Sequence, residues 1–263
     1  MGLAETRFYG YGRENGEVGV RNHVAVLAVD GLCNAAVDGI ARLIRGTVPV
    51  THPYGRLQFG ADLDLTFRTL IGIGSNPNVA AALVVGFEPV WTGVVSEGIA
   101  KAGKPVESVV LHGHGILKAV EEGARKARGL VLDASELRRE PFNPSKLRVS
   151  IKCGASDTTS GIASNPSLGV AVDHLIDLGA TVLFGESTEL AGAEHIIARR
   201  AVNDDVRREF LEVVRGYVDF AVSKGVDILG SQPTQENIAG GLTTIEEKAL
   251  GNIQKTGTKP ILG

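Results

Sequence analysis

The chain has 263 residues, of which 43% are hydrophobic and 22% charged, with a formal net charge of -3. This composition is typical of a soluble globular protein with one large or two medium domains, and it gives no reason to expect a nucleic acid or an anionic membrane as a partner. Because we find no apolar stretch of bilayer-spanning length, no signal peptide and no disulfide framework in its two cysteines, we expect a cytoplasmic protein.

Short apolar runs alternate with amphipathic segments along the first half of the chain. Before them, a glycine-rich segment at 10–22 does not follow a strand, so it is not a dinucleotide-binding fingerprint, and we interpret it as a hairpin. The alternation predicts a parallel sheet with helices on both of its faces. The expected strands are 24–29, 47–51, 79–85 and 106–111, and the expected helices are 33–44, 63–73, 93–102 and 116–127.

Two prolines, Pro141 and Pro144, interrupt this alternation and indicate a linker. We therefore expect an N-terminal α/β part over residues 1–142 and a C-terminal α/β part over residues 143–263. The predicted fold class is α/β, with two parallel-sheet βα units, Rossmann-like or flavodoxin-like halves, joined by the proline-bearing linker. In the second part the pattern predicts strands at 147–152 and 181–185 and helices at 167–178, 190–200 and 204–223.

The polar loop at 152–161 is the strongest chemical signal in the chain. It holds a cation, a thiol, a carboxylate, four hydroxyl groups and two glycines, directly after a predicted strand. Open α/β sheets place their chemistry at the carboxyl ends of strands, so this loop is a candidate site. An ordinary strand-to-helix turn with Ser and Asp caps would have the same composition, and both interpretations stay open.

Other polar residues stand at the ends of predicted strands. Glu186 follows the last of them, where a purely structural carboxylate is costly, although the same segment would also make a helix cap. His52 ends the second strand, in place for acid–base work, for metal binding or for a hydrogen bond to a turn. Arg21 and Asn22 suit either a carboxylate ligand or a surface turn with a salt bridge.

Four segments together resemble the altronate/galactarate dehydratase family. The order of these segments and their residues match the large-domain part of these sugar-acid dehydratases over residues 8 to 263. The family also includes the large subunit of a sulfolactate sulfo-lyase, so the motifs indicate β-elimination from a hydroxy acid more firmly than they indicate the substrate. The segments are 10–22, 152–169 (KCGASDTTSGIASNPSLG), 185–201 (GESTELAGAEHIIARRA) and 237–251 (NIAGGLTTIEEKALG).

The resemblance implies a lyase of sugar acid catabolism. Its main implication is a hydro-lyase that dehydrates a sugar acid such as altronate or galactarate to a 2-keto-3-deoxy acid. The alternatives are a sulfo-lyase acting on sulfolactate and a non-catalytic subunit or paralogue that lost the metal site. The resemblance also implies a divalent metal, Fe²⁺ or else Mn²⁺. We expect a small-molecule hydroxy acid as ligand, a homo-oligomer, and a separate small subunit supplying the N-terminal domain of the fused dehydratases.

The chemistry implied by the resemblance selects the candidate site residues. A proton next to a carboxylate must be removed and the resulting charge stabilised by a metal or by cations. The choice of base among the candidates stays open. The catalytic candidates are Lys152, Asp157, Glu186, Glu189 and Lys248; the substrate-binding candidates are Arg21, Asn22, Ser156, Asn165, Thr243 and Thr244; and the metal candidates are His52 and Cys153.

The sequence also departs from the family pattern. Arg56 stands where members have a Cys after the strand-end His, Asn76 stands for a His, and Phe87 stands for the Cys of a Gly-Cys-Glu motif. If those groups bind or support iron in relatives, the iron site here is altered or lost. The final part of the family's large domain is absent as well, so we expect a split subunit, a shortened paralogue or a fragment.

Overall fold

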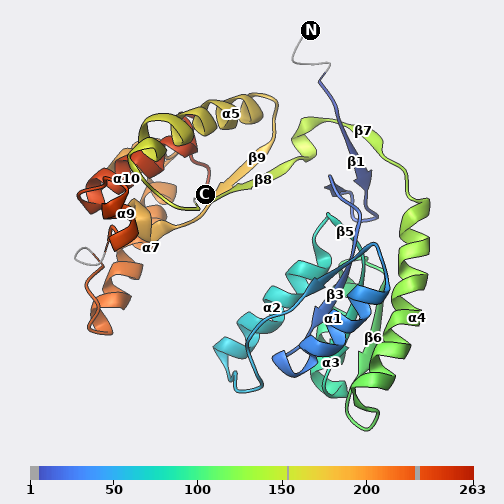
Figure 1. The fold of residues 1–263 in the computed structure, drawn as a ribbon. Helices are drawn as coiled ribbons and strands as arrows, with labels where there is room; N and C mark the ends of the chain where they lie inside the picture. Colours follow the sequence, from blue (N-terminus) through green and yellow to red (C-terminus); the bar gives the residue numbers. More distant parts are fainter. Residues whose placement is uncertain (1–5, 153, 229–231) are drawn as a thin grey trace. The chain divides into compact units, whose positions relative to one another are not determined.

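The computed structural model describes residues 6–152, 154–228 and 232–263 (Figure 1). The chain forms two compact units, one made of Arg7–Phe142 and the other mostly of Asn143–Gly263. The division falls between Pro141 and Pro144.

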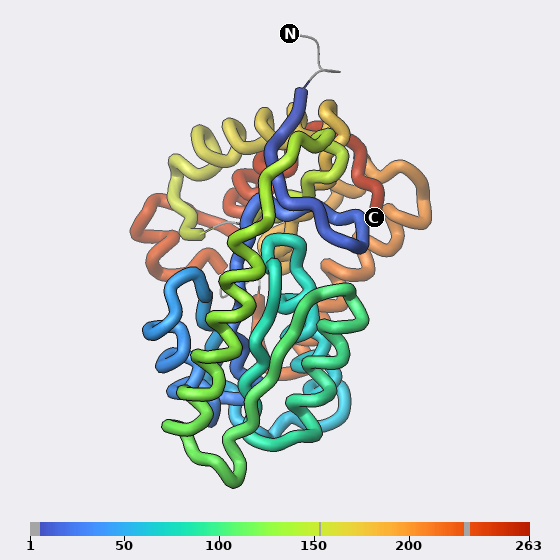
Figure 2. The backbone as a smooth tube through the Cα atoms, turned by 90° about the vertical axis from the view of Figure 1, so that its right-hand side faces the viewer, coloured from blue at the N-terminus to red at the C-terminus, as the bar shows by residue number. Residues whose placement is uncertain are grey.

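The first unit is built on a four-stranded parallel sheet in the order β4-β3-β5-β6. The predicted parallel sheet with helices on both faces is confirmed for this unit: α1 and α4 pack together on one face, and α2 and α3 on the other. Figure 2 shows α4 as one long helix along the sheet. The strands are β3 (His23–Ala28), β4 (Thr47–Val50), β5 (Val79–Gly86) and β6 (Val106–Val110), and the helices are α1 (Asn34–Leu43), α2 (Ala61–Ser75), α3 (Pro89–Lys101) and α4 (Gly115–Glu136).

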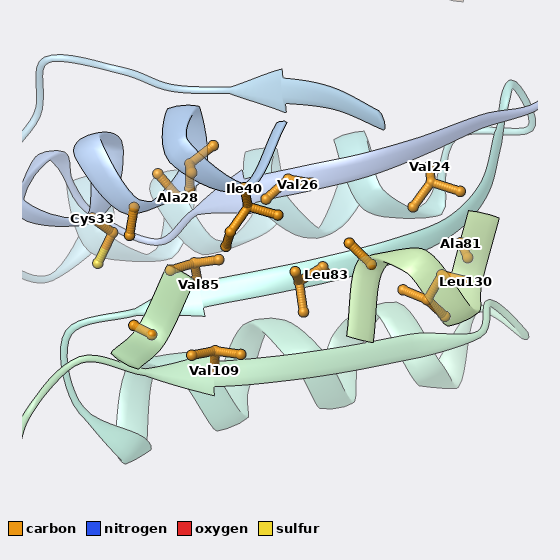
Figure 3. Close-up of a cluster of buried hydrophobic side chains, with 14 of the residues drawn as sticks. Val24, Val26, Ala28, Cys33, Ile40, Ala81, Leu83, Val85, Val109 and Leu130 are labelled. Carbon is orange, nitrogen blue, oxygen red and sulfur yellow. The ribbon is translucent and has the colours of Figure 1, made fainter. Parts of the chain in front are cut away.

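Alternation along the central strands fills two separate cores. Val24 and Val26 on β3 point to the side of α1 and α4, where they meet Ile40 and Leu83 (Figure 3). The intervening residue Leu27 belongs to the core on the side of α2 and α3. β5 is buried along its entire length because helices cover both of its faces, which explains why it reads as a continuous apolar run.

A small antiparallel sheet completes the first unit. β1 (Phe8–Gly12) pairs with β2 (Val18–Gly19) and with β7 (Glu140–Phe142), which confirms the predicted hairpin. The sequence did not predict β7, since its central residue is Pro141, and proline is tolerated only at a sheet edge. Gly19 is required here because a Cβ atom would lie 2.0 Å from the carbonyl oxygen of Pro77.

The second unit contains one pair of parallel strands among its described residues. β8 (Arg148–Ile151) and β9 (Thr181–Phe184) lie side by side, joined by the crossover helix α5 (Asn165–Asp177), as the sequence predicts. The expected Rossmann-like or flavodoxin-like half is wrong beyond this pair, because the chain after β9 has helical and not strand periodicity. It forms α6 (Glu194–Ala198), α7 (Asp204–Ser223), α9 (Gln235–Ala239) and α10 (Ile245–Ile253).

The helix expected at 190–200 is also corrected. Gly192 adopts a φ of 96°, outside the helical region, and divides the segment into a 3-10 turn, Ser187–Leu190, and the short helix α6. The core of this unit forms mainly between the turn, α7 and α10. Among the described residues of both units, no helix combines the length and apolar character needed to cross a bilayer.

Cys33 is fully buried in the core beside α1 (Figure 3). Burial, with the nearby charge of Asp30, raises the pKa of its thiol to about 12. In a Cys153→Ser variant, which leaves Cys33 as the single thiol, we expect iodoacetamide at mildly alkaline pH to modify the unfolded protein but not the native one. Mass spectrometry of native and urea-unfolded samples checks this result. Equal rates of modification in the two states would contradict it.

Candidate functional site

The parallel pairing of β8 and β9 brings Glu186 and Lys152 together just beyond their carboxyl ends. Oε1 of Glu186 lies 2.8 Å from Nζ of Lys152. Oε2 of the same carboxylate accepts a hydrogen bond from Nζ of Lys255 at 2.7 Å. Each carboxylate oxygen of Glu186 therefore forms an ion pair with one lysine. We call Lys152, Glu186 and Lys255 the lysine–glutamate clamp.

The two lysines of the clamp differ in their exposure to solvent. The side chain of Lys152 is 72% exposed, whereas that of Lys255 is 1% exposed and that of Glu186 is 14% exposed. Lys255 lies in the 3-10 turn Gln254–Thr256, which packs against α5. The sequence analysis missed Lys255, because a single lysine in a short turn carries no pattern that distinguishes a buried cation from an exposed one.

The backbone of Glu186 is held in an unusual conformation. Its φ of 68° and ψ of 46° are left-handed, and no other described residue except glycine has a positive φ. For a residue with a side chain this conformation costs about 1–2 kcal/mol. Such strain is most often kept where a side chain must be aimed, which favours a functional interpretation of Glu186 over a helix cap.

A second ionic cluster surrounds Lys248 on α10. Its Nζ lies 2.9 Å from Oε1 of Glu189, 2.9 Å from Oε1 of Gln232 and 3.2 Å from Oδ1 of Asn237. These acceptors use all three ammonium hydrogens, and Lys248 is only 7% exposed. The amide nitrogen of Glu189 donates to the carbonyl of Glu186, so this cluster adjoins the lysine–glutamate clamp.

A cavity of about 220 Å³ lies between the loop after β8 and helix α10. The two sides are tied together by Asn237, whose Nδ2 donates to the carbonyl of Ser156 at 2.8 Å, and by Asn165, whose Nδ2 donates to the carbonyl of Gly251 at 2.9 Å. The structure thus brings candidates from two of the matched segments, 152–169 and 237–251, to one cavity. Its polar lining includes Ser156, Asp157, Asn165, Lys248 and Asn252.

Asp157 has a local structural role at the rim of this cavity. Oδ1 accepts hydrogen bonds from the amide and hydroxyl of Thr159 and from the amide of Ser160. The hydroxyl of Thr159 and the amide of Ser160 hold the pKa of Asp157 below its usual range, so it is a weak proton acceptor. This arrangement matches the cap interpretation that the sequence left open.

Thr243 and Thr244 organise the start of α10. Thr244 caps the helix by accepting from the amide of Glu247, while the amide and hydroxyl of Thr243 donate to Oε2 of Glu247. The Thr243 hydroxyl lowers the pKa of Glu247, which stays ionised beside the helix N-terminus. Neither threonine lines the cavity beside α10, and the contacts of both support the fold at the start of this helix.

Three of the site residues predicted from the sequence, Arg21, Asn22 and His52, belong to the first unit. Asn22 accepts from Arg13 at 3.0 Å and donates to the carbonyl of Ala134 at 2.7 Å, which is a structural role. Arg21 is exposed, and its side chain donates to the carbonyl of Val20. Nε2 of His52 lies 3.1 Å from the carbonyl oxygen of Ala28 and therefore carries the proton.

An ionic cluster that the sequence analysis missed lies at the carboxyl ends of β3 and β5. Arg56 binds Asp30 at 3.0 Å and Glu88 at 3.1 Å, and its guanidinium carbon lies 4.1 Å from the ring centroid of Trp91. It also lies 5.8 Å from the ring centroid of Phe87. The two positions at which the family pattern has thiols are therefore neighbours in this fold, and they hold a cation and an aromatic ring.

The described residues do not fit an iron site. They contain no group of three or more His, Cys, Asp or Glu side chains arranged to hold a metal. Nε2 of His52 donates to a carbonyl, and Arg56 occupies Asp30 and Glu88. The remaining metal candidate, Cys153, lies outside the described residues. No catalytic step is therefore assigned to a metal.

Family models match both units. Residues 144–263 match the model described as D-galactarate/Altronate dehydratase, C-terminal, and residues 10–135 match the model described as D-galactarate dehydratase/Altronate hydrolase, second domain. The chain belongs to the D-galactarate/altronate dehydratase family. This confirms the resemblance inferred from the four sequence segments.

Individual relatives differ widely in their similarity to this family member. The chain is 55% identical over 260 residues to the (2R)-sulfolactate sulfo-lyase subunit beta of Chromohalobacter salexigens, which covers 98% of this chain and 67% of that subunit. It is 29% identical to altronate dehydratase of Bacillus subtilis and 30% identical to galactarate dehydratase (L-threo-forming) of Escherichia coli. The chain spans 53% of the length of either dehydratase.

Proposed function

We propose that the chain is a subunit of a lyase that eliminates sulfite from (2R)-sulfolactate. The observation that carries this proposal is the 55% identity to a sulfo-lyase subunit beta over 98% of the chain, against 29–30% for the dehydratases. This identity favours the sulfo-lyase, whereas the sequence motifs alone led us to expect dehydration of a sugar acid as the main activity. Dehydration stays the second candidate, because both family models are named for dehydratases.

The proposed reaction is a β-elimination. A base removes the proton on C2 of sulfolactate, the C–H electron pair forms the C2–C3 double bond, and the C3–S bond breaks so that sulfite leaves with its electron pair. The resulting enol of pyruvate then takes a proton at C3 and releases its hydroxyl proton to solvent, which gives the keto acid. The chemistry requires a carboxylate or amine as the base and cations near the substrate's anionic groups.

Glu186 is the proposed base. Its strained backbone and its position beyond a strand end support a functional role. Asp157 is the weaker candidate because its pKa is lowered by the hydroxyl of Thr159 and the amide of Ser160, and Lys248 gives its ammonium hydrogens to three acceptors. Glu189 is the second candidate, since its Oε2 has no hydrogen-bond partner among the described residues.

Partner subunits belong to the proposal as well. The sulfo-lyase relative is named a subunit beta, which favours a heteromeric enzyme with a separate small subunit. A homo-oligomer of the present chain is also compatible with this assembly. The divalent metal implied by the resemblance, Fe²⁺ or Mn²⁺, is included in the test as an added component.

The experiment uses the full chain, coexpressed with any small subunit encoded beside it. Sulfite and pyruvate are measured with (2R)-sulfolactate, and 2-keto-3-deoxy acid is measured with altronate and galactarate, each with and without added Fe²⁺ or Mn²⁺. We expect sulfite and pyruvate in equal amounts from sulfolactate. Keto acid from altronate or galactarate alone would establish the dehydratase instead, and no product from any acid would show a non-catalytic subunit.

A further inference from the structure

We propose that Asn252 on α10 recognises the C2 hydroxyl of the substrate and makes the site selective for a 2-hydroxy acid. The inference rests on the proposed function and adds the residue that distinguishes a hydroxy acid from other small anions. Oδ1 of Asn252 accepts the hydrogen bond, and the hydroxyl of the substrate donates it.

Asn252 belongs to the buried face of α10 and also lines a cavity. The buried residues of this helix recur at helical spacing, and Asn252 is among them with 3% of its surface exposed. It contributes to the lining of the cavity of about 220 Å³ beside the loop after β8. A polar side chain buried to this extent is costly unless its polar atoms have hydrogen-bond partners.

Within the described part of the chain, one end of the Asn252 amide has a partner and the other has none. Nδ2 donates to the carbonyl oxygen of Glu189 at 3.5 Å, which fixes the opposite end of the amide as the oxygen. That oxygen, Oδ1, is buried and has no hydrogen-bond partner among the described residues. Lys248, one turn earlier on the same face of α10, already gives its three ammonium hydrogens to other acceptors. A ligand in the cavity is the donor that this acceptor requires.

The chemistry of the substrate decides which of its groups pairs with Oδ1. At neutral pH the carboxylate and the sulfonate of sulfolactate are acceptors alone, and the C2 hydroxyl is the single donor. Oδ1 therefore attracts the hydroxyl and repels the two anionic groups. The C2 hydroxyl is retained when sulfite leaves C3, and equally when water leaves C3 of a sugar acid, so this contact serves either elimination.

The position of Asn252 also relates the hydroxyl to the proton that must be removed. Asn252 contacts the backbone of Glu189, in the turn for which Glu186 is the N-cap residue. C2 carries both the hydroxyl and the proton, so a hydroxyl bound to Oδ1 holds C2 beside the segment 186–189, which contains both candidate bases. Fixing the reacting carbon in this way is a direct contribution to catalysis.

The same contact favours release of the product and rejection of related acids. After elimination, the enol hydroxyl at C2 loses its proton and becomes the carbonyl oxygen of the keto acid, which is an acceptor. Two acceptors then face each other, so Asn252 holds the substrate but not the product. An acid without the hydroxyl is rejected because it leaves Oδ1 buried without a donor.

The test compares (2R)-sulfolactate with 3-sulfopropanoate, which lacks the hydroxyl, in the assembled enzyme. If sulfolactate is turned over, its KM is set against the inhibition constant of 3-sulfopropanoate; if it is not, calorimetry gives both dissociation constants. In Asn252→Leu and Asn252→Ala we expect sulfolactate to bind about 10- to 100-fold more weakly. 3-Sulfopropanoate should bind both variants at least as tightly as wild type, because the acceptor that lacked a donor is gone. If the activity screen identifies a sugar acid, that acid and its 2-deoxy analogue replace this pair.

A purely structural role for Asn252 would weaken the binding of both acids alike, and that result would overturn the assignment. An unchanged preference for the hydroxy acid in the variants would overturn it as well. Gln235→Leu is the matched control, because it exchanges an exposed amide on α9 for the same apolar side chain and should leave both constants unchanged. Circular dichroism measures the folded fraction of each variant.

The outcomes separate this inference from the proposed function. A preference for a hydroxy acid that depends on Asn252, without release of sulfite, would support the inference and contradict the sulfo-lyase. Release of sulfite with an unchanged preference in the variants would support the sulfo-lyase and contradict the inference. A wild type that binds no hydroxy acid would contradict both.

Discussion

Turnover of the accepted hydroxy acid falls about 100- to 10,000-fold in a Glu186→Gln variant, the range that a general base contributes. Glutamine keeps the size of the side chain and an oxygen acceptor for Lys255, but it cannot take the C2 proton. Exchange of that proton with solvent, followed by NMR in D₂O, should be lost together with sulfite release. The loss of both signals places the defect at proton removal and not at a later step.

The matched control is Glu212→Gln, which removes an exposed carboxylate from α7 in the same unit. Its turnover should equal that of wild type, since surface substitutions rarely alter stability by more than about 0.5 kcal/mol. Wild-type turnover in Glu186→Gln would show that this residue is not the base. Glu189→Gln would then be the next variant to measure.

The largest stability loss is expected for Lys248→Met, at about 3–5 kcal/mol, because removing one partner leaves the mostly buried Glu189 without its cation. Gln232 and Asn237 lose a donor at the same time. Urea unfolding followed by circular dichroism measures the change in unfolding free energy. An intact stability would show that Lys248 does not organise the unit.

The double variant Lys248→Met with Glu189→Gln provides an internal check. Neutralising Glu189 should restore part of the lost stability, since the isolated charge is then gone. Lys224→Met, an exposed lysine after α7, should leave the unfolding free energy within about 0.5 kcal/mol of wild type. Equal losses in Lys248→Met and in the double variant would argue against an ionic role for this pair.

Much of the first unit could be predicted from its sequence, because parallel strands with both faces covered give continuous apolar runs. β3 and β5 are such runs, and the amphipathic segments between the strands gave α1 to α4. In the second unit the same reasoning located β8 and β9 but overestimated the sheet. Gly192 broke an expected helix through a backbone angle that helical periodicity does not encode.

The candidate site was predictable only in part. Lys152 and Glu186 follow adjacent strands, so the sequence identified both. Lys255 lies 69 positions from Glu186, and nothing local marks its burial. The ion pairs of Arg56 were missed for the same reason, since its partners Asp30 and Glu88 follow two other strands. Long-range ion pairs of this kind depend on tertiary packing, which pattern analysis of a single sequence does not reach.

The contacts that close the site join distant parts of the chain. Glu186 to Lys255, Ser156 to Asn237 and Asn165 to Gly251 span 69, 81 and 86 positions. Loops of this length must lose their conformational entropy before any of these contacts forms, so they assemble late in folding. During synthesis, Lys152 and Glu186 emerge from the ribosome well before Lys255. The lysine–glutamate clamp is therefore complete only after the last ten residues of the chain have begun to emerge.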